Sequence, residues 1–213
     1  KADGLQGIAR LKTRKTTRSE GAETPRPADR VNRQFTAAAP NALWVADLTY
    51  IRTHSGWVYA AFVLDVFSRM VVGWQVSTTM HTDLALDALN MGLWARSRAG
   101  HDVAGLIHHS DRGSQYVSLA YTDALVTAGV TASVGTVGDS YDNALAETVN
   151  GLYKTDLIYS RPVWETASTV ELATMGWVNW WNTQRLHETL DYRPPADVEA
   201  AYTHPTTTAP ATV

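Results

Sequence analysis

The chain of 213 residues contains no cysteine, and this absence excludes several kinds of chemistry at once. It forms no disulfide, no thiolate zinc site and no cysteine nucleophile, so any metal ion must bind Asp, Glu or His. No apolar run approaches the roughly 18 residues that a membrane span needs. No charged-then-apolar signal segment opens the chain. We therefore expect a soluble protein that stays in the cytoplasm and has no membrane partner.

Charged residues are also sparse, at 18% of the chain against 45% hydrophobic residues, which leaves ample apolar material for a globular core. The net charge of −3 hides an uneven distribution, because residues 1–34 carry nine bases and four acids, hence +5, and the remainder carries −8. A basic arm joined to an acidic globule suits a protein that binds a polyanion with one part and cations with another. A solvated linker would have the same composition.

Three regions follow from composition. Residues 19–41 contain three prolines and no periodic pattern, so we expect residues 1–42 to be a basic arm and linker. The chain begins with Lys1 and not with Met, which suggests that the sequence is a fragment whose preceding residues are missing. We expect residues 43–202 to form the globular core, and residues 203–213, which have few large apolar side chains, to be a disordered tail.

Apolar patterning predicts an α/β fold. Three strands joined by short turns form an antiparallel meander over Leu43–Arg52, Trp57–Val66 and Met70–Ser77. Helices and strands then alternate, with expected bounds Thr82–Arg96 (helix, capped by Thr82), Leu106–Ser110, Leu119–Ala128 (helix), Val130–Val134, Tyr141–Tyr159 (helix, capped by Ser140) and Glu165–Gln184 (helix). This order predicts a mixed sheet with helices on both faces.

Two aspartates stand where a carboxylate needs an explanation. Asp47 interrupts an apolar strand, where burying a lone carboxylate is costly unless a cation or hydrogen-bond donors compensate. Asp111 follows a buried strand, at the carboxyl end where α/β sheets assemble their sites. Each also has an ordinary interpretation, since Asp47 could pair with an arginine and Asp111-x-Gly113 is a common turn.

A third acid, Glu147, lies on a polar helix face. At 100° per residue it shares that face with Asn143, Asn150 and Lys154, opposite an apolar stripe formed by Leu145, Val149 and Leu152. A solvated helix face would look the same. If the three acids meet at one sheet edge, however, they offer the oxygen ligands that Mg²⁺ prefers. Two such ions about 3.5–4 Å apart clamp the attacking and leaving oxygens of a phosphoryl displacement.

Four motifs carry a resemblance to a known family, and together they cover about residues 41–202. They are Trp44-Val-Ala-Asp-Leu-Thr-Tyr50, His108-His-Ser-Asp-Arg-Gly-Ser-Gln-Tyr116, Gly138-Asp-Ser-Tyr-Asp-Asn-Ala-Leu-Ala-Glu147 and Trp181-Asn-Thr-Gln-Arg-Leu-His187. The 35 residues between Asp111 and Glu147 match the Asp-Asp-35-Glu signature. The chain thus resembles the integrase-core transposases of bacterial insertion sequences, relatives of retroviral integrases.

The resemblance implies a ribonuclease H-like fold, with a mixed five-stranded sheet made of the meander and parallel strands. It implies that Asp47, Asp111 and Glu147 are catalytic residues and ligands of two Mg²⁺ ions, which Mn²⁺ can replace. On the family pattern, Asp47 and Asp111 hold the ion that activates the nucleophile. Asp47 and Glu147 hold the ion that stabilises the leaving oxygen.

The family also implies DNA partners, namely the terminal inverted repeats of the element and the target DNA. We expect metal-dependent strand cleavage and strand transfer by a homo-oligomer, associated with the bacterial nucleoid. Lys154, Asn143 and Asn150 are the expected DNA contacts of the core. The arm is expected to add salt-dependent phosphate contacts through its basic residues Lys12, Arg14, Lys15 and Arg18.

Other motif residues have simpler expected roles. We expect His108 and His109 to be packed or hydrogen-bonded, Asp65 and Asp142 to serve turns and helix starts, and the tryptophans at 177, 180 and 181 to lie in the core. Arg185 and His187 belong to the family motif without an assigned role.

Two other functions compete with the transposase. One is an inactive remnant of a mobile element that binds DNA or a partner chain without cutting. The other is a hydrolase that uses His108, His109 and Asp111 as a transition-metal site, which leaves Asp47 and Glu147 without a task.

Overall fold

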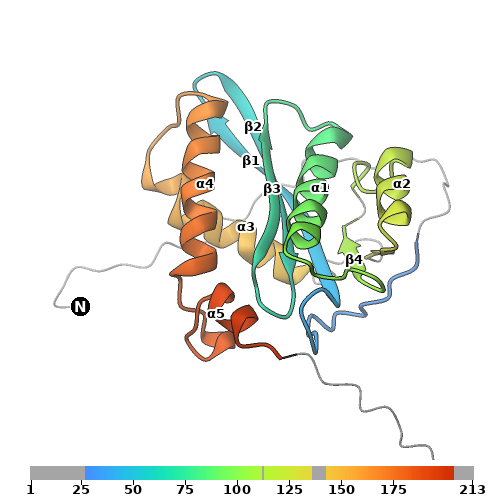
Figure 1. Ribbon diagram of the computed structural model, residues 1–213. Coiled ribbons are helices and arrows are strands. Elements are labelled where there is room, and N and C mark those ends of the chain that lie inside the picture. The colour runs from blue at the N-terminus through green and yellow to red at the C-terminus, as the bar shows by residue number, and fades with distance from the viewer. Residues whose placement is uncertain (1–26, 112, 136–142, 204–213) are drawn as a thin grey trace, which may run out of the picture.

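The computed structural model describes residues 27–111, 113–135 and 143–203. Five strands form one mixed sheet in the order β3-β2-β1-β4-β5 (Figure 1). β1 (Leu43–Thr53), β2 (Gly56–Asp65) and β3 (Val71–Ser77) are antiparallel, as the meander predicted. β4 (Ile107–Ser110) runs parallel to β1, and β5 (Thr131–Val134) runs parallel to β4. The expected fold class is therefore confirmed.

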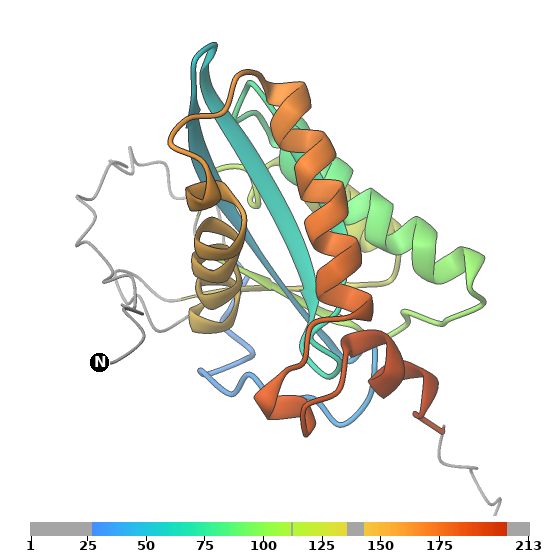
Figure 2. The same cartoon turned by 90° about the vertical axis from the view of Figure 1, so that its left-hand side faces the viewer.

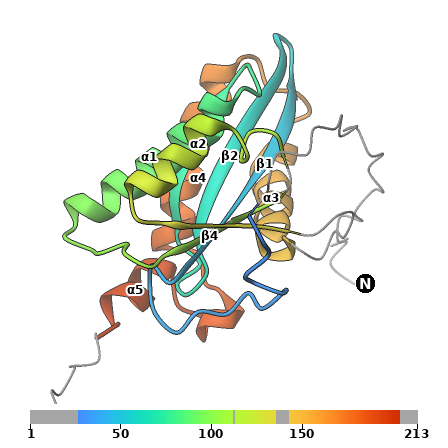
Figure 3. The same ribbon diagram turned by 90° about the vertical axis from the view of Figure 1, so that its right-hand side faces the viewer.

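Helices cover both faces of this sheet. α3 (Ala144–Asp156) and α4 (Ala167–Thr183) lie on one face, and α1 (Thr82–Arg98) and α2 (Leu119–Thr127) lie on the other (Figures 2 and 3). The 3₁₀ turns η1 (Ile158–Ser160) and η2 (Glu188–Leu190) and the short helix α5 (Pro195–Ala200) complete the described chain. No helix within these ranges is long and apolar enough to cross a membrane.

Each face of the sheet has its own hydrophobic cluster, because successive residues of β1 point to opposite sides. Val45 and Ile51 pack with Tyr153 of α3 and Trp177 of α4. The other cluster contains Trp44, Ala46 and residues of α1 and α2. Trp177 and Trp181 are buried as expected, whereas Trp180 is 37% exposed.

Helix starts were predicted less well than strands. α1 begins at Thr82, but its N-cap is His81 and makes no side-chain cap bond, so the expected Thr82 cap is wrong. α2 is instead capped by Ser118, whose side chain accepts a hydrogen bond from Tyr121 N. The expected start at Tyr141, with its Ser140 cap, and the role of Asp142 fall outside the described residues.

Packed structure begins before Leu43. Val31 is buried, Arg30 N donates to Ser133 Oγ (2.9 Å) on β5, and Asn41 N donates to Asp65 Oδ2 (2.7 Å). Residues 27–42 thus line the sheet, whereas composition alone suggested a linker there. Residues 1–26 and 204–213 lie outside the described residues, so the basic arm and the tail stay predictions.

Asp65 organises the end of β2. Its carboxylate accepts hydrogen bonds from Phe67 N and Ser68 N of the following turn, which confirms the expected structural role. Arg96 Nη2 of α1 lies 3.6 Å from Asp65 Oδ2. The two terminal nitrogens of Arg96 each donate a hydrogen bond to the Glu199 carboxylate of α5 (2.5 and 2.6 Å). This buried network fastens the C-terminal helix to the sheet.

The outer edge of the sheet, β3, is held by side chains of α4. Asn182 accepts a hydrogen bond from Val71 N and donates one to Val71 O, both at 2.9 Å. Trp181 Nε1 donates to the carbonyl of Arg69 just before this strand (2.8 Å). Side-chain groups therefore satisfy the first outward-facing backbone groups of this edge strand.

Close packing of α1 on β3 depends on Gly73, because a Cβ there would lie 2.0 Å from the carbonyl oxygen of Ala88. We predict that Gly73→Ala lowers the free energy of unfolding by about 3 kcal/mol, at the upper end of overpacking costs. Urea denaturation measures the change. Gly176→Ala is the matched control, since a Cβ at that helical position meets nothing within 4 Å. It should raise stability by about 0.5–1 kcal/mol, and equal effects of the two variants would contradict the packing.

Candidate active site

Strand pairing brings the two aspartates together. β4 pairs with only the first residues of β1, and the last pair in this parallel ladder is Ala46 with Ser110. Asp47 and Asp111 each follow directly, so they occupy neighbouring positions where the two strands part. Adjacent strands lie about 4.8 Å apart. Asp47 is half-buried and Asp111 is exposed.

Glu147 approaches from α3, and two amides on either side of it hold the helix against β1. Asn143 Nδ2 donates to the carbonyl of Ala46 (2.9 Å), and Asn150 Nδ2 donates to Asp47 Oδ2 (2.9 Å). Glu147 itself is exposed, between these two anchors. The three acids thus come from β1, the end of β4 and the first turns of α3.

The acids lie close enough for neighbouring negative charge to raise the pKa values of Asp47 and Glu147. The pKa of Asp47 is raised from 3.8 to about 7, chiefly by burial and then by the charges of Asp111 and Glu147, against opposing hydrogen bonds from Leu48 N and Asn150. Burial raises the pKa of Glu147, and the charge of Asp111 adds to it. Burial also raises the pKa of Asp111, with the Gly113 N–H opposing. Negative charge in this region is therefore only partly compensated.

The residue set fits a hard divalent cation, although the side chains do not converge on one point. Within the described residues, no three His, Cys, Asp or Glu side chains are close enough to form a ready-made metal site. Asp111 Oδ1 accepts a hydrogen bond from Gly113 N (2.8 Å), so Asp111 also makes the turn that its sequence suggested. Buried oxygens nevertheless remain unsatisfied beside Asp47, because Asn143 Oδ1 and Asn150 Oδ1 accept no hydrogen bond there. Mg²⁺ prefers oxygen ligands, and among the described residues these oxygens have no partner beside them that accounts for their burial.

The polar face expected on α3 needs a correction. The residues that α3 buries are Ala146, Val149, Asn150 and Tyr153, and Asn143 is buried as well. The apolar stripe expected through Leu145 and Leu152 is only partly buried. The physical reason is that β1 has lost β4 as a partner beyond Ala46, so its carboxylate and carbonyl attract the amides inward. Periodicity classes asparagine as a surface residue and misses this.

Of the expected DNA contacts, Lys154 is placed beside the acids. It is half-buried, its Nζ lies 4.5 Å from the centroid of the Tyr50 ring, and it is attracted to Asp47. Burial lowers its pKa more than this attraction raises it. The arm residues Lys12, Arg14, Lys15 and Arg18 lie outside the described residues.

The two histidines beside Asp111 are structural, as expected. His108 Nε2 lies 3.0 Å from the Tyr121 hydroxyl, and His109 Nδ1 lies 2.9 Å from Ser133 Oγ. Both are buried, and burial lowers the pKa of His108 to about 3. The imidazoles have separate partners, so nothing in the described chain supports the metallohydrolase alternative.

The motif residues Arg185 and His187 pack against the end of α4. The guanidinium of Arg185 lies 4.6 Å from the Trp181 ring centroid, and the His187 ring contacts the same indole edge-on. Arg185 Nη1 is 3.2 Å from His187 Nδ1, and burial lowers the pKa of His187 to about 4. These contacts give Arg185 and His187 a packing role at the end of α4. The position of the two residues in the sequence did not reveal this role.

Comparison with known proteins agrees with the geometry. Two family models described as "Integrase core domain" match residues 37–140 and 128–195. A protein of insertion sequence element IS986/IS6110 from Mycobacterium tuberculosis is 51% identical over 200 residues, which are 93% of this chain and 72% of that protein. The transposase for insertion sequence element IS629 from Shigella sonnei is 53% identical over 199 residues, covering 93% of this chain and 64% of the relative.

Solved structures support the fold. A simian T-cell lymphotropic virus intasome in complex with a PP2A regulatory subunit aligns with a TM-score of 0.65 at 18% identity, over 92% of this chain and 66% of that chain. The catalytic core domain of HTLV-2 integrase, solved in complex with magnesium, aligns with a TM-score of 0.55 at 16% identity, over 76% of this chain and 98% of that chain. At such low identity these two likenesses show the fold alone. The family models and the close sequence relatives show that the chain belongs to the integrase-core transposases of bacterial insertion sequences and carries their DNA transposase catalytic domain.

Proposed function

We propose that this domain cleaves and joins DNA strands at the ends of its insertion element, with Asp47, Asp111 and Glu147 as the catalytic carboxylates. The observation that supports this proposal most is the register of β1 and β4, which makes Asp47 and Asp111 neighbours, with α3 presenting Glu147 to the same region. The inactive-remnant alternative is not favoured, because all three acids of the signature are present in a chain so similar to transposases.

Two Mg²⁺ ions, replaceable by Mn²⁺, would be held by Asp47 with Asp111 and by Asp47 with Glu147. When bound, such ions supply Lewis-acid stabilisation of the attacking and leaving oxygens. Asp47, which would serve both ions, is oriented by the Asn150 amide and by Leu48 N (2.8 Å). Asn143 fixes the start of α3 through Ala46, and so positions Glu147. The two amides thus have a positioning role in this proposal, and Lys154 is left as the DNA contact.

The reaction has two displacements at phosphorus. Water first attacks a phosphodiester at the element end, and the broken P–O bond leaves a 3′-hydroxyl. That hydroxyl then attacks a phosphodiester of the target DNA, which joins the strands and releases another 3′-hydroxyl. No side chain becomes covalently linked to DNA. The proposed substrates are the terminal inverted repeats and target DNA, bridged by a homo-oligomer on the bacterial nucleoid.

A cleavage assay tests the carboxylates. The wild-type chain is incubated with a duplex that carries an element end, with Mg²⁺, with Mn²⁺ or with chelator. We predict that Glu147→Gln lowers metal-dependent nicking about a thousandfold, which corresponds to a loss of about 4 kcal/mol of transition-state stabilisation. Glu171→Gln is the matched control, an exposed acid on α4. Metal-independent nicking, or unchanged nicking by Glu147→Gln, would remove Glu147 from the mechanism.

The raised pKa of Asp47 predicts how stability depends on pH without metal. Unfolded Asp47 ionises near 3.8 and folded Asp47 near 7, so between these values the folded state holds the extra proton. Its stabilising effect is complete below 3.8 and is lost as the pH rises through about 7. We therefore predict that the melting temperature in chelator falls from pH 4 to pH 8, and that Asp47→Asn flattens this slope.

Added Mg²⁺ should raise the melting temperature of the wild-type chain at pH 7.5, and it should not raise that of Asp47→Asn, because ligand binding to the folded state alone is stabilising. Asp123→Asn serves as the control, an exposed acid on α2. If Asp47→Asn leaves the fall in melting temperature between pH 4 and pH 8 unchanged, Asp47 is not the titrating group.

A further inference from the structure

Four side chains make a continuous stack of cations and aromatic rings at the β1–β2 hairpin. Lys154 Nζ lies 4.5 Å from the Tyr50 ring centroid, and the Tyr50 and Trp57 rings meet edge-to-face at 5.4 Å. The Arg52 guanidinium lies 5.2 Å from the Trp57 ring centroid. We call the set Tyr50, Arg52, Trp57 and Lys154 the hairpin surface.

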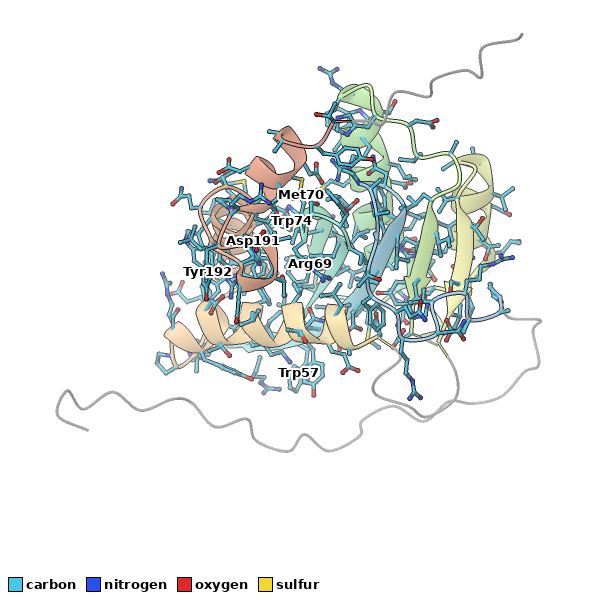
Figure 4. All side chains as sticks on the ribbon, turned by 90° about the horizontal axis from the view of Figure 1, so that it is seen from below. Trp57, Arg69, Met70, Trp74, Asp191 and Tyr192 are labelled. Carbon is cyan, nitrogen blue, oxygen red and sulfur yellow. The ribbon has the colours of Figure 1, made fainter. Side chains whose placement is uncertain are left out.

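The sheet topology explains why these rings are exposed. β4 leaves β1 after Ala46, so among the described residues the outer half of β1 has no strand partner on that side until Thr53 forms a bridge with Trp164. Arg52 is paired with Trp57 across the hairpin, and Tyr50 with Tyr59, so Tyr50, Arg52 and Trp57 point to one face of the sheet. Lys154 comes from α3, which packs on the other face, and its Nζ reaches the Tyr50 ring from there. Tyr50 is 37% exposed and Trp57 is 47% exposed, and Figure 4 shows Trp57 projecting away from the body of the molecule. Clustered exposed aromatic rings are typical of interaction sites.

The hairpin surface adjoins the proposed active site. Tyr50 follows Asp47 by three residues on β1, and Lys154 follows Glu147 by about two turns of α3. Lys154 is attracted to Asp47 itself. Lys154 therefore lies between the acids and the rings, so a DNA strand whose phosphodiester reaches the three acids would pass Lys154 before it meets Tyr50 and Trp57 on the opposite face of β1.

The chemistry of this surface matches an unpaired DNA strand. In the part of the chain that the structure describes, neither Arg52 nor Lys154 forms an ion pair within 4 Å, and both rest on ring faces. Two adjacent aromatic rings flanked by two cations offer a single strand stacking partners for its bases and positive charges for its phosphates. A double helix keeps its bases stacked inside and would meet only the cations.

We propose that the hairpin surface binds unpaired nucleotides next to the scissile phosphate, with bases stacked on Trp57 and Tyr50 and phosphates contacted by Arg52 and Lys154. The proposal rests on the proposed function and adds to it a preference for frayed or single-stranded DNA ends. It gives Trp57 a role in substrate binding, although the proposed catalytic steps do not use this residue.

The chain offers a matched control. Trp94 on α1 is 64% exposed and carries Arg98 at 5.3 Å from its ring centroid, so it reproduces the Trp57–Arg52 pair in isolation. The Trp94–Arg98 pair on α1 includes neither a second aromatic ring nor Asp47. A general effect of removing an exposed tryptophan would appear equally in both variants.

The test measures fluorescence anisotropy of two labelled duplexes in chelator, which prevents cleavage. One duplex is blunt and the other has a three-nucleotide single-stranded overhang. We expect the wild-type chain to prefer the overhang, and Trp57→Ala to weaken overhang binding about tenfold while blunt binding changes less than twofold. Trp57→Phe should retain most of the preference, because it keeps a π-face, and Trp94→Ala should match wild type.

Thermal unfolding of each variant shows whether the hairpin persists. The proposal is overturned if the wild-type chain shows no preference for the overhang, if Trp57→Ala keeps the preference, or if Trp57→Phe loses it as fully as Trp57→Ala at unchanged stability. Failure of the proposed function looks different. A chain that prefers the overhang through Trp57, but nicks no DNA with Mg²⁺ or Mn²⁺, would keep the stacking surface and lose the catalytic assignment.

Discussion

Two amide side chains of α3, from Asn143 and Asn150, hold that helix against the strand that carries Asp47, and the geometry of the site depends on them. Beyond Ala46 the strand β1 has no β4 partner, and a buried carbonyl or carboxylate left unsatisfied costs about 1–3 kcal/mol. The amides remove that cost at Ala46 and Asp47. Because the two anchors flank Glu147 in sequence, they also fix which residue of the helix faces the aspartates.

The same arrangement keeps three carboxylates near one another, with the half-buried Lys154 attracted to Asp47. Burial and mutual repulsion raise the pKa values of Asp47 and Glu147, and burial raises that of Asp111, so the metal-free site favours protonated acids. Functional sites commonly hold such unfavourable arrangements, which the surrounding fold stabilises. The acidic charge of the core is in part the charge of this site.

The sequence predicted the sheet and helices well because their patterns are long and local. Period-2 runs identified the meander, and the position of Asp47 in one of them already marked it as unusual. The inward face of α3 could not be predicted, since Asn150 is buried only because Asp47 lies opposite, and that pairing joins residues 103 positions apart. Residues 27–42 were misjudged for the same reason, because their partners, such as Ser133, are distant in the chain. The hairpin surface was missed too. Tyr50 and Trp57 look like ordinary strand residues until the early end of β4 is known.

The hydrogen bonds between Asn182 and Val71 have a consequence for assembly. An edge strand with free backbone groups is a template onto which another chain can add a strand. Here one asparagine occupies both outward groups of Val71 at the start of β3 and acts as a side-chain substitute for a sixth strand. Continuous sheet extension from one copy to the next would have to break these bonds first. The start of β3 is thereby protected from pairing with a strand of another chain.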